Sequence, residues 1–318
     1  MAHTRRLAAT ASSSHPLLRR IARYRGVYLI MLPGLVYYLV YKYLPMYGVV
    51  IAFKDISPLS GFREIYFGGQ WVGLKYFERF VSSFYFWNVV RNTLVFSLLR
   101  LLLGPTLAIM LALMLNEVRN LVFKRVAQTV SYLPHFISWV VVASLVHAIL
   151  SVDGGLLNLI ITGLGGDAVL FLGDPRFFRV IALSTWMWHG VGWGSIIYLA
   201  AIAGIDPELY DAAIIDGAGR IRQVFAITIP TIAPIIVILL ILRIGDILDG
   251  GFDLILNIYS PGVYGVADII DTFVYREGLL RVQYSYAAAV GVFKSVIGLL
   301  LVVVADRAAK QLGQSGLW

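Results

Sequence analysis

Long apolar stretches separated by short polar segments make up most of this chain. Six of the stretches are long enough to cross a hydrocarbon layer of about 30 Å, which takes roughly 20 helical residues. They fall near residues 27–52, 89–115, 127–150, 179–204, 230–249 and 284–305. Because a helix satisfies its own backbone hydrogen bonds in lipid, the pattern predicts an all-α polytopic membrane protein with six transmembrane helices.

The composition agrees with a membrane protein and excludes an ordinary soluble domain. Hydrophobic residues make up 59% of the chain, charged residues make up 14%, and the mean hydropathy is +0.80. The formal charge of +8 is spread among the loops and the N-terminus. That distribution fits membrane orientation better than nucleic-acid binding. No cysteine is present, so the chain can form neither a disulfide nor a cysteine-ligated metal site.

The first 26 residues are rich in Ala, Ser, Thr and Arg. We predict that 1–26 is a basic cytoplasmic tail beside anionic membrane lipid, and that 27–318 forms one transmembrane domain. A cleaved signal peptide is the competing interpretation of the N-terminus. The apolar run is too long for one, however, and it lacks a small-residue cleavage site.

Basic residues gather near alternate ends of the predicted spans. They are Arg5, Arg6, Arg19, Arg20, Arg23, Arg25, Arg119, Lys124, Arg125, Arg220, Arg222, Arg307 and Lys310. The opposite loops carry more acids and fewer bases. Since basic loops stay on the cytoplasmic side, both termini and the segment between the fourth and fifth spans are predicted to be cytoplasmic.

That cytoplasmic segment, 205–230, is the most polar interruption between two spans. Asp206 is suited to cap a helix whose first residue is Pro207. Gly217 and Gly219 then allow the chain to reverse. A helical face follows at Ile221, Val224, Phe225 and Thr228. The segment therefore predicts a helix-turn-helix between two membrane spans.

The same segment contains Asp211-Ala212-Ala213, then Gly217 after three residues, then Ile227-Thr228-Ile229-Pro230 after nine more. This pattern resembles the coupling loop in permease subunits of bacterial ABC importers, which reads Glu-Ala-Ala, three residues, Gly, nine residues, Ile-x-Leu-Pro. Several fixed positions agree, and the loop precedes the penultimate span in both.

Other residues narrow the resemblance, which covers about residues 27–305. Tyr210, Asp216 and Ala218 look like the carbohydrate-importing branch. Three upstream stretches look like the oligosaccharide and polysaccharide subgroup of that branch. They are Leu32-Pro33-Gly34, Tyr43-Leu44-Pro45-Met46-Tyr47-Gly48 and Ala52-Phe53-Lys54-Asp55.

In that family the loop forms a short coupling helix that inserts into a cleft of the nucleotide-binding subunit. The resemblance implies that role for Asp211, Ala212, Ala213, Asp216 and Gly217. Asp211 departs from the pattern, because its acid arm is one methylene shorter than that of the usual glutamate. The plainer interpretation is that Asp211 and Gly217 merely cap and turn a loop. A loop that is only capped and turned would not require the fixed spacing from Gly217 to Ile227 and Pro230, so this spacing favours the coupling helix.

The chain carries no visible machinery for using ATP. It has no G-x-x-x-x-G-K-[ST] pattern and no Gly-Lys pair, so ATP and Mg are expected on a separate chain. Neither G-x-S-x-G nor H-E-x-x-H occurs, which predicts a non-catalytic subunit without cofactor or metal. The resemblance implies a distinct, homologous second permease, two ATP-binding cassette subunits and an extracytoplasmic solute-binding protein, in a bacterial inner membrane.

Candidates for substrate contact lie in the fourth and fifth spans. Trp186 and Trp188 offer flat faces for sugar rings, although tryptophans are also common in an interface belt. His189 either joins them or only hydrogen-bonds to a neighbouring span. Arg243 and Asp246 stand at i, i+3 spacing, where an ion pair can form. Because a charge in lipid costs about 3 kcal/mol, these groups are expected to face protein or water.

These features together predict the permease subunit of an ATP-driven carbohydrate importer that works by alternating access. An oligosaccharide is the expected substrate. If it is acidic, such as a uronate oligomer, Arg243 with Arg100 and Lys294 would attract it. A stand-alone ion-coupled transporter or channel and a membrane-embedded enzyme are the alternatives, and the coupling pattern argues against both.

Overall fold

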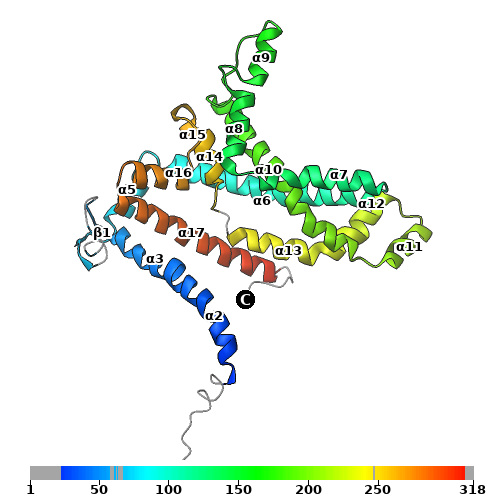
Figure 1. The fold of residues 1–318 in the computed structure, drawn as a ribbon, viewed down its shortest axis with the longest axis horizontal. Helices are drawn as coiled ribbons and strands as arrows, with labels where there is room; N and C mark the ends of the chain where they lie inside the picture. The colour runs from blue at the N-terminus through cyan, green and yellow to red at the C-terminus, as the bar shows by residue number, and fades with distance from the viewer. Residues whose placement is uncertain (1–22, 58–60, 62, 64–66, 246–247, 312–318) are drawn as a thin grey trace, which may run out of the picture.

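The computed structural model describes residues 23–57, 61, 63, 67–245 and 248–311 (Figure 1). The predicted all-α class is confirmed, since helices form nearly all of the described structure. Within it, strands are limited to the antiparallel pair of β1 (Lys54–Asp55) with β2 (Gln70–Trp71). Most of the predicted basic tail lies outside the described residues.

Four helices are individually long and apolar enough to cross a membrane. The first runs over Arg25–Phe53 and comprises α2 (Arg25–Tyr38), the π-turn η1 (Leu39–Tyr43), α3 (Leu44–Met46) and the 3-10 segment η2 (Tyr47–Phe53). The others are α6 (Phe86–Glu117), the stretch Arg220–Ile244, and the first part of α17 (Tyr284–Gln311). Two bent helix pairs pass the same test, and counting each pair as one span gives six, the number that the sequence predicts.

The third predicted span, 127–150, is not one straight helix. α7 (Leu121–Tyr132) continues into the 3-10 turn η3 (Leu133–Phe136), and α8 (Trp139–Leu150) then leaves at 103°. The cause is local, because Ile137 and Ser138 both have extended backbones. Ser138 Oγ then accepts a hydrogen bond from the amide of Val141, which starts a new helix.

Short helices occupy the segments predicted to be extracytoplasmic. The first of these segments contains α5 (Lys75–Val81). The next predicted outer loop contains α9 (Leu156–Gly163). The last contains α14 (Phe252–Ile258), η5 (Pro261–Val263), α15 (Tyr264–Ala267), α16 (Ile270–Tyr275) and the π-turn η6 (Arg276–Leu280).

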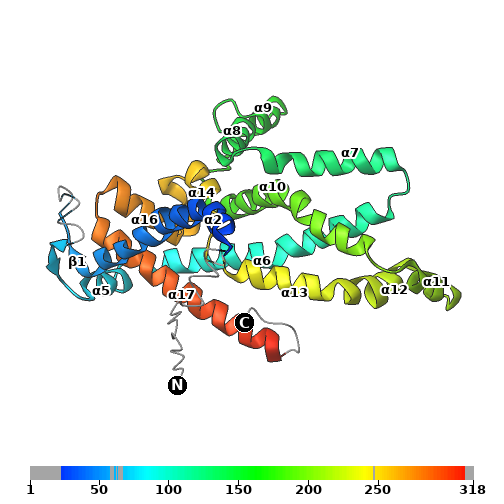
Figure 2. The ribbon, with the colours of Figure 1, turned by 60° about the horizontal axis from the view of Figure 1, so that its bottom comes forward.

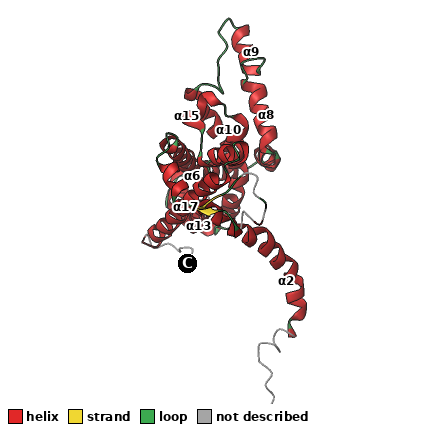
Figure 3. Ribbon diagram, turned by 90° about the vertical axis from the view of Figure 1, so that its left-hand side faces the viewer, coloured by secondary structure: helices red, strands yellow, loops and turns green. Residues whose placement is uncertain are grey.

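The long helices α6, α10 (Pro175–Ala203), α13 (Ile229–Gly245) and α17 form an elongated bundle (Figures 1 and 2). One buried cluster packs α6, α8, α10 and α14 around Phe178 and Val142. Another packs α5, α16 and α17 around Phe80 and Phe273. A third joins α6, α10 and α13 around Ile202 and Ile232. Outside this bundle, α8 and α9 project to one side and α2 to another (Figure 3).

Candidate coupling surface and transport pathway

α11 (Pro207–Ile215) extends from one end of the bundle and is bent by 71° from α10 (Figure 2). The side chain of Asp206 accepts a hydrogen bond from the amide of Glu208 at 3.0 Å, and Pro207 takes the first helical position. The predicted helix start is therefore confirmed. Glu208 also places an acid in the first turn, where the helix dipole favours it.

The end of α11 depends on one glycine. Gly217 has a φ of +76°, which side chains with a Cβ rarely adopt. Around it the amide of Ala218 donates to the carbonyl of Ala213 at 2.8 Å, and the amide of Gly217 donates to that of Ile214 at 3.0 Å. This is the Schellman pairing that closes a helix. Gly219 has an ordinary φ of −67°, so the predicted reversal requires Gly217 and not Gly219.

The chain then enters the next span without a break. α12 (Arg220–Gln223), the π-turn η4 (Val224–Thr228) and α13 follow one another directly. The helix of this span therefore begins at Arg220, earlier than the apolar stretch predicted near 230–249. Pro230, which lacks an amide proton, comes directly after the wide π-turn rather than at a helix start.

Side-chain contacts attach α11 to the bundle. The hydroxyl groups of Tyr210 and Thr228 lie 2.9 Å apart, and the Tyr210 ring packs against the cluster around Ile202. The amide group of Gln223 donates to the carbonyl of Ala218 at 2.9 Å. Arg220 forms an ion pair with Glu117 at the end of α6. Movement of α11 would therefore be passed directly to α6, α10 and α13.

The predicted coupling residues lie together on this end of the molecule. Asp211, Ala212, Asp216 and Gly217 are exposed, and Ala213 is partly buried. Sequence reasoning did not single out the exposed apolar side chains beside them, and it placed Ile221 only on a helical face. Ile215 is 87% exposed and Ile221 is 77% exposed, and Leu209 and Ile214 are exposed as well. Exposed apolar side chains grouped beside acids are typical of a surface that another protein covers.

The second candidate region lies in the middle of the bundle. The guanidinium carbon of Arg100 is 4.3 Å from the ring centroid of Trp186, within cation–π range. Arg243 approaches the same ring, because a Cβ built on Gly104 would lie 3.2 Å from Cζ3 of Trp186 and 3.3 Å from Nη1 of Arg243. Asp246 lies outside the described residues, and its predicted pairing with Arg243 stays a prediction.

Trp188 and His189 lie elsewhere. Trp188 is 50% exposed and borders an outer groove with Met110 and Met114. His189 is buried, with Nε2 3.0 Å from the carbonyl of Ile137 and its ring stacked on Trp139 at 3.9 Å. This geometry favours a structural role for His189 at the bend between α7 and α8.

Lys294 of α17 also has an acidic neighbour. Its ammonium group donates to both carboxylate oxygens of Asp271, at 2.6 and 2.7 Å. Burial raises the pKa of the Asp271 carboxyl, while the hydrogen bond from Lys294 acts in the opposite direction. Lys294 is therefore less available to an acidic substrate than the sequence suggests.

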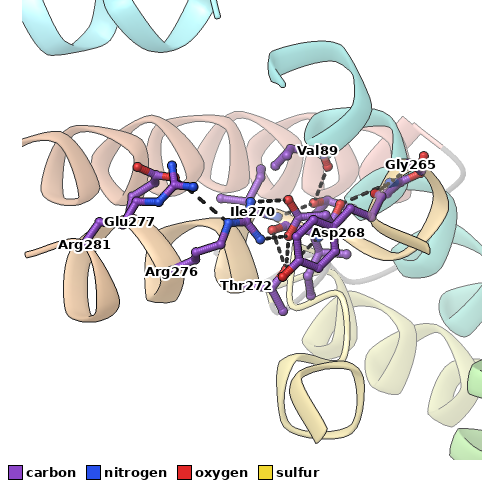
Figure 4. Close-up of polar contacts among 12 residues, drawn as sticks. Val89, Gly265, Asp268, Ile270, Thr272, Arg276, Glu277 and Arg281 are labelled. Atoms are coloured by element: carbon purple, nitrogen blue, oxygen red, sulfur yellow. Dashed lines mark hydrogen bonds and ion pairs between the residues drawn. The ribbon is translucent and has the colours of Figure 1, made fainter. Parts of the chain in front are cut away.

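A buried polar network, which sequence reasoning missed, connects the last outer segment to α6 (Figure 4). Arg276 donates two hydrogen bonds to the Asp268 carboxylate, at 3.0 and 2.6 Å, and the Thr272 hydroxyl donates to it at 2.8 Å. The side-chain amide of Asn92 donates to the Asp268 carbonyl at 3.1 Å. Hydrogen bonds to Asp268 raise the pKa of Arg276 against the effect of burial.

The fold defines a polytopic α-helical membrane protein with an exposed helix, α11, attached at one end of the bundle. A family model described as "Binding-protein-dependent transport system inner membrane component" matches residues 104–315. The chain belongs to this family of ABC importer permeases, which are non-catalytic membrane subunits without a cofactor. It is a multi-pass inner-membrane protein that works with a solute-binding protein, as predicted.

Relatives match over nearly their whole lengths. The chain is 46% identical over 302 residues to the polygalacturonan/rhamnogalacturonan transport system permease protein YteP of Bacillus subtilis (strain 168), covering 95% of this chain and 93% of YteP. It is 44% identical over 309 residues to the protein LplB of the same organism, covering 97% and 96%. These matches confirm the predicted carbohydrate-type branch.

A solved structure has the same architecture. The chain resembles a crystal structure of a bacterial ABC transporter involved in import of the acidic polysaccharide alginate, with a TM-score of 0.85 and 39% identity. The match covers 93% of this chain and 99% of that one. A second structure, of the alginate transporter with its pentasaccharide-bound periplasmic protein, matches with a TM-score of 0.85 and 38% identity over 95% of this chain and 100% of that one.

Proposed function

We propose that this chain forms half of the translocation pathway of an ATP-driven importer for acidic oligosaccharides. A second permease, distinct but homologous, would form the other half. Two ATP-binding cassette subunits would bind ATP and Mg, and the solute-binding protein would deliver the sugar. The observation that carries the proposal is the exposed α11, whose Tyr210 packs against the cluster formed by α6, α10 and α13 and contacts Thr228, while Arg220 just after it pairs with Glu117 of α6.

α11 would act as the coupling helix. A rigid link is needed to convert closure of the ATPase subunits into a change in which side of the pathway is open. The contact between Tyr210 and Thr228, the hydrogen bond of Gln223 and the Schellman turn at Gly217 supply that rigidity. Asp211 is exposed in the first turns of α11, within reach of a basic residue on another protein.

The substrate class is supported by the relatives and by charge. YteP is named for polygalacturonan and rhamnogalacturonan, and the structural match is named for alginate, an acidic polysaccharide. In this chain the guanidinium of Arg100 lies over the ring of Trp186, and the guanidinium of Arg243 and the same ring both approach Gly104 inside the bundle. Such groups suit a substrate that carries carboxylates.

The end of the bundle that bears α11 would face the cytoplasm. Arg119, Arg220 and Arg222 belong to this end, and Arg220 contacts Glu117 there. Under the positive-inside rule, both termini would be cytoplasmic as well.

Copurification and transport test the proposal together. The four-subunit complex should hydrolyse ATP faster when sugar-loaded binding protein is added, and vesicles containing it should accumulate a labelled uronate oligomer only with ATP. Uptake by this chain alone, without ATPase subunits, would instead support an ion-coupled transporter.

A further inference from the structure

Arg100 lies at the centre of a long membrane helix. It is 14 residues from the start of the 32-residue α6, which puts it about 21 Å from that helix end. Its side chain is only 17% exposed. A guanidinium at this depth is costly unless protein, a ligand or water satisfies it.

The backbone opposite Arg100 is not helical. Nη1 of Arg100 donates to the main-chain carbonyl of Asp249, and Gly251 has a φ of +90°. Residues 248–251 therefore interrupt the helical structure at the level of the middle of α6. Irregular backbone at membrane depth is tolerated where protein buries it or where it lines a water-filled cavity.

The guanidinium of Arg100 is incompletely satisfied by its neighbours. Its Nε is enclosed and has no hydrogen-bond acceptor among the described residues. The Asp249 carboxylate is 3.9 Å from Nη1, too far for a hydrogen bond. Within the described ranges, Arg243 forms no ion pair with a carboxylate.

A small polar cavity adjoins this cluster. It has a volume of about 40 Å³ and is bordered by Arg100, Trp139, Trp186, Asp249 and Asp253. That space accommodates about three water-sized groups, which suits the two oxygens of a carboxylate. Phe252 borders this cavity and also a larger one of about 720 Å³ that Tyr275 and Tyr284 line, which gives a longer saccharide room beside the cluster.

We propose that Arg100, Trp186 and Arg243 form a subsite that recognises the carboxylate of one uronate unit in the transported oligosaccharide. The two guanidinium groups bind the carboxylate, and the indole packs against the sugar. Asp249 is the internal competitor, because its carboxylate faces Arg100 when substrate is absent. This inference deepens the proposed function and rests on it.

The test uses the complete complex in vesicles with its binding protein. Uptake of trigalacturonate is compared with uptake of its trimethyl ester, which has the same rings without the charges. Arg243→Gln should raise KM for the acid about tenfold or more relative to the ester, the size expected for a lost charge-assisted hydrogen bond. Every variant receives the sugar from the same binding protein. Any preference of the binding protein for acid over ester is therefore equal in all variants and cancels when their ratios of KM values are compared.

Two more variants give different expected directions. Arg243→Lys keeps the charge and should retain most of the preference for the acid. Asp249→Asn keeps the main-chain carbonyl that Arg100 bonds but removes the competing charge, so KM for the acid should fall several-fold. Arg176→Gln is the control, because Arg176 starts the helix that carries Trp186 and its side chain is 80% exposed.

The outcomes separate this subsite from the proposed function. If wild-type complex takes up neither trimer with ATP, the proposed function fails and the subsite fails with it. If it takes up the acid, and Arg243→Gln and Asp249→Asn leave the ratio of KM values for acid and ester unchanged, the subsite is overturned and the importer remains.

Discussion

At the scale of single residues, Gly217 is the position where sequence and backbone geometry agree most closely. A Cβ at Gly217 would meet no atom within 4 Å, so the cost of adding one comes from the left-handed backbone alone. That cost is about 1 kcal/mol for alanine. A Cβ added at Gly219 would also lie in open space, but φ is ordinary there, so the backbone adds no strain.

We therefore expect Gly217→Ala to loosen the turn after α11 and to reduce ATP hydrolysis stimulated by loaded binding protein several-fold. Gly219→Ala should behave like wild type, because its φ is ordinary. The measurement is the ratio of stimulated to basal hydrolysis in the purified complex. Equal ratios for the two alanine variants would show that the turn is not part of coupling.

Asp55, Lys75 and Tyr76 form a second residue-scale feature, outside the membrane spans. The Tyr76 hydroxyl and the Lys75 ammonium donate to the Asp55 carboxylate at 2.7 and 3.0 Å. These hydrogen bonds hold the pKa of Asp55 below its ordinary value of 3.8. Burial, together with the bond to Asp55, raises the pKa of Tyr76 to about 12.

The sign of the pH dependence follows from these directions. A lowered carboxyl pKa stabilises the folded chain above pH 3.8 and loses its effect as the pH falls through the folded-state pKa. We expect Asp55→Asn to lower the melting temperature at pH 7 and to have a smaller effect at pH 3, measured by thermal unfolding in detergent. An equal loss of melting temperature at pH 7 and at pH 3 would contradict the lowered pKa of Asp55.

At the scale of elements, a buried ion pair between Asp268 and Arg276 holds together the outer segment that carries α15 and α16, and Asn92 of α6 donates a hydrogen bond to the Asp268 carbonyl. Both side chains of the Asp268 and Arg276 pair are nearly inaccessible. Removing one partner leaves a buried charge and costs about 3–5 kcal/mol, whereas removing both costs less.

A double-mutant cycle tests this contact. Asp268→Asn should lower thermal stability strongly, and the combination with Arg276→Gln should be more stable than the sum of the single effects predicts. Arg281→Gln is the control, because Arg281 is exposed although it pairs with Glu277. Additive effects of the two substitutions would contradict a coupled buried pair.

The helices were predictable where the apolar pattern is continuous, and less so where they bend. Asp206 and Pro207 mark the start of α11 in the sequence itself, as capping residues do. The bend between α7 and α8 comes from the extended backbones of Ile137 and Ser138. The apolar pattern continues past these residues, so it did not reveal the bend. In the same way, the helical face expected to stand apart after Gly219 is continuous with the fifth span.

The two candidate sites differed in predictability for a related reason. The coupling residues are neighbours in the sequence, so their spacing could be compared directly. Arg100, Trp186 and Arg243 come from α6, α10 and α13, and their approach to one another follows from tertiary packing. The exposure of Ile215 likewise requires knowledge of which face of α11 packs inward.

At the scale of the whole molecule, the described chain leaves large apolar surfaces uncovered. α2 has no buried residue along its 14 positions, and it projects from the bundle (Figure 3). Lipid and a second permease would cover such surfaces. Such a surface fits the proposal that the chain is one subunit of a larger membrane complex that receives its energy input at the end carrying α11.

The most direct test asks whether an ATPase subunit covers α11. Because the chain has no cysteine, Ile215→Cys introduces a single reactive thiol on α11, and Leu164→Cys provides a matched exposed position beyond α9. We predict that a maleimide labels both in the chain alone, and that adding the ATPase subunits protects Ile215→Cys but not Leu164→Cys. Unchanged labelling of Ile215→Cys in an assembled, ATP-hydrolysing complex would contradict the assignment of α11 as the coupling helix.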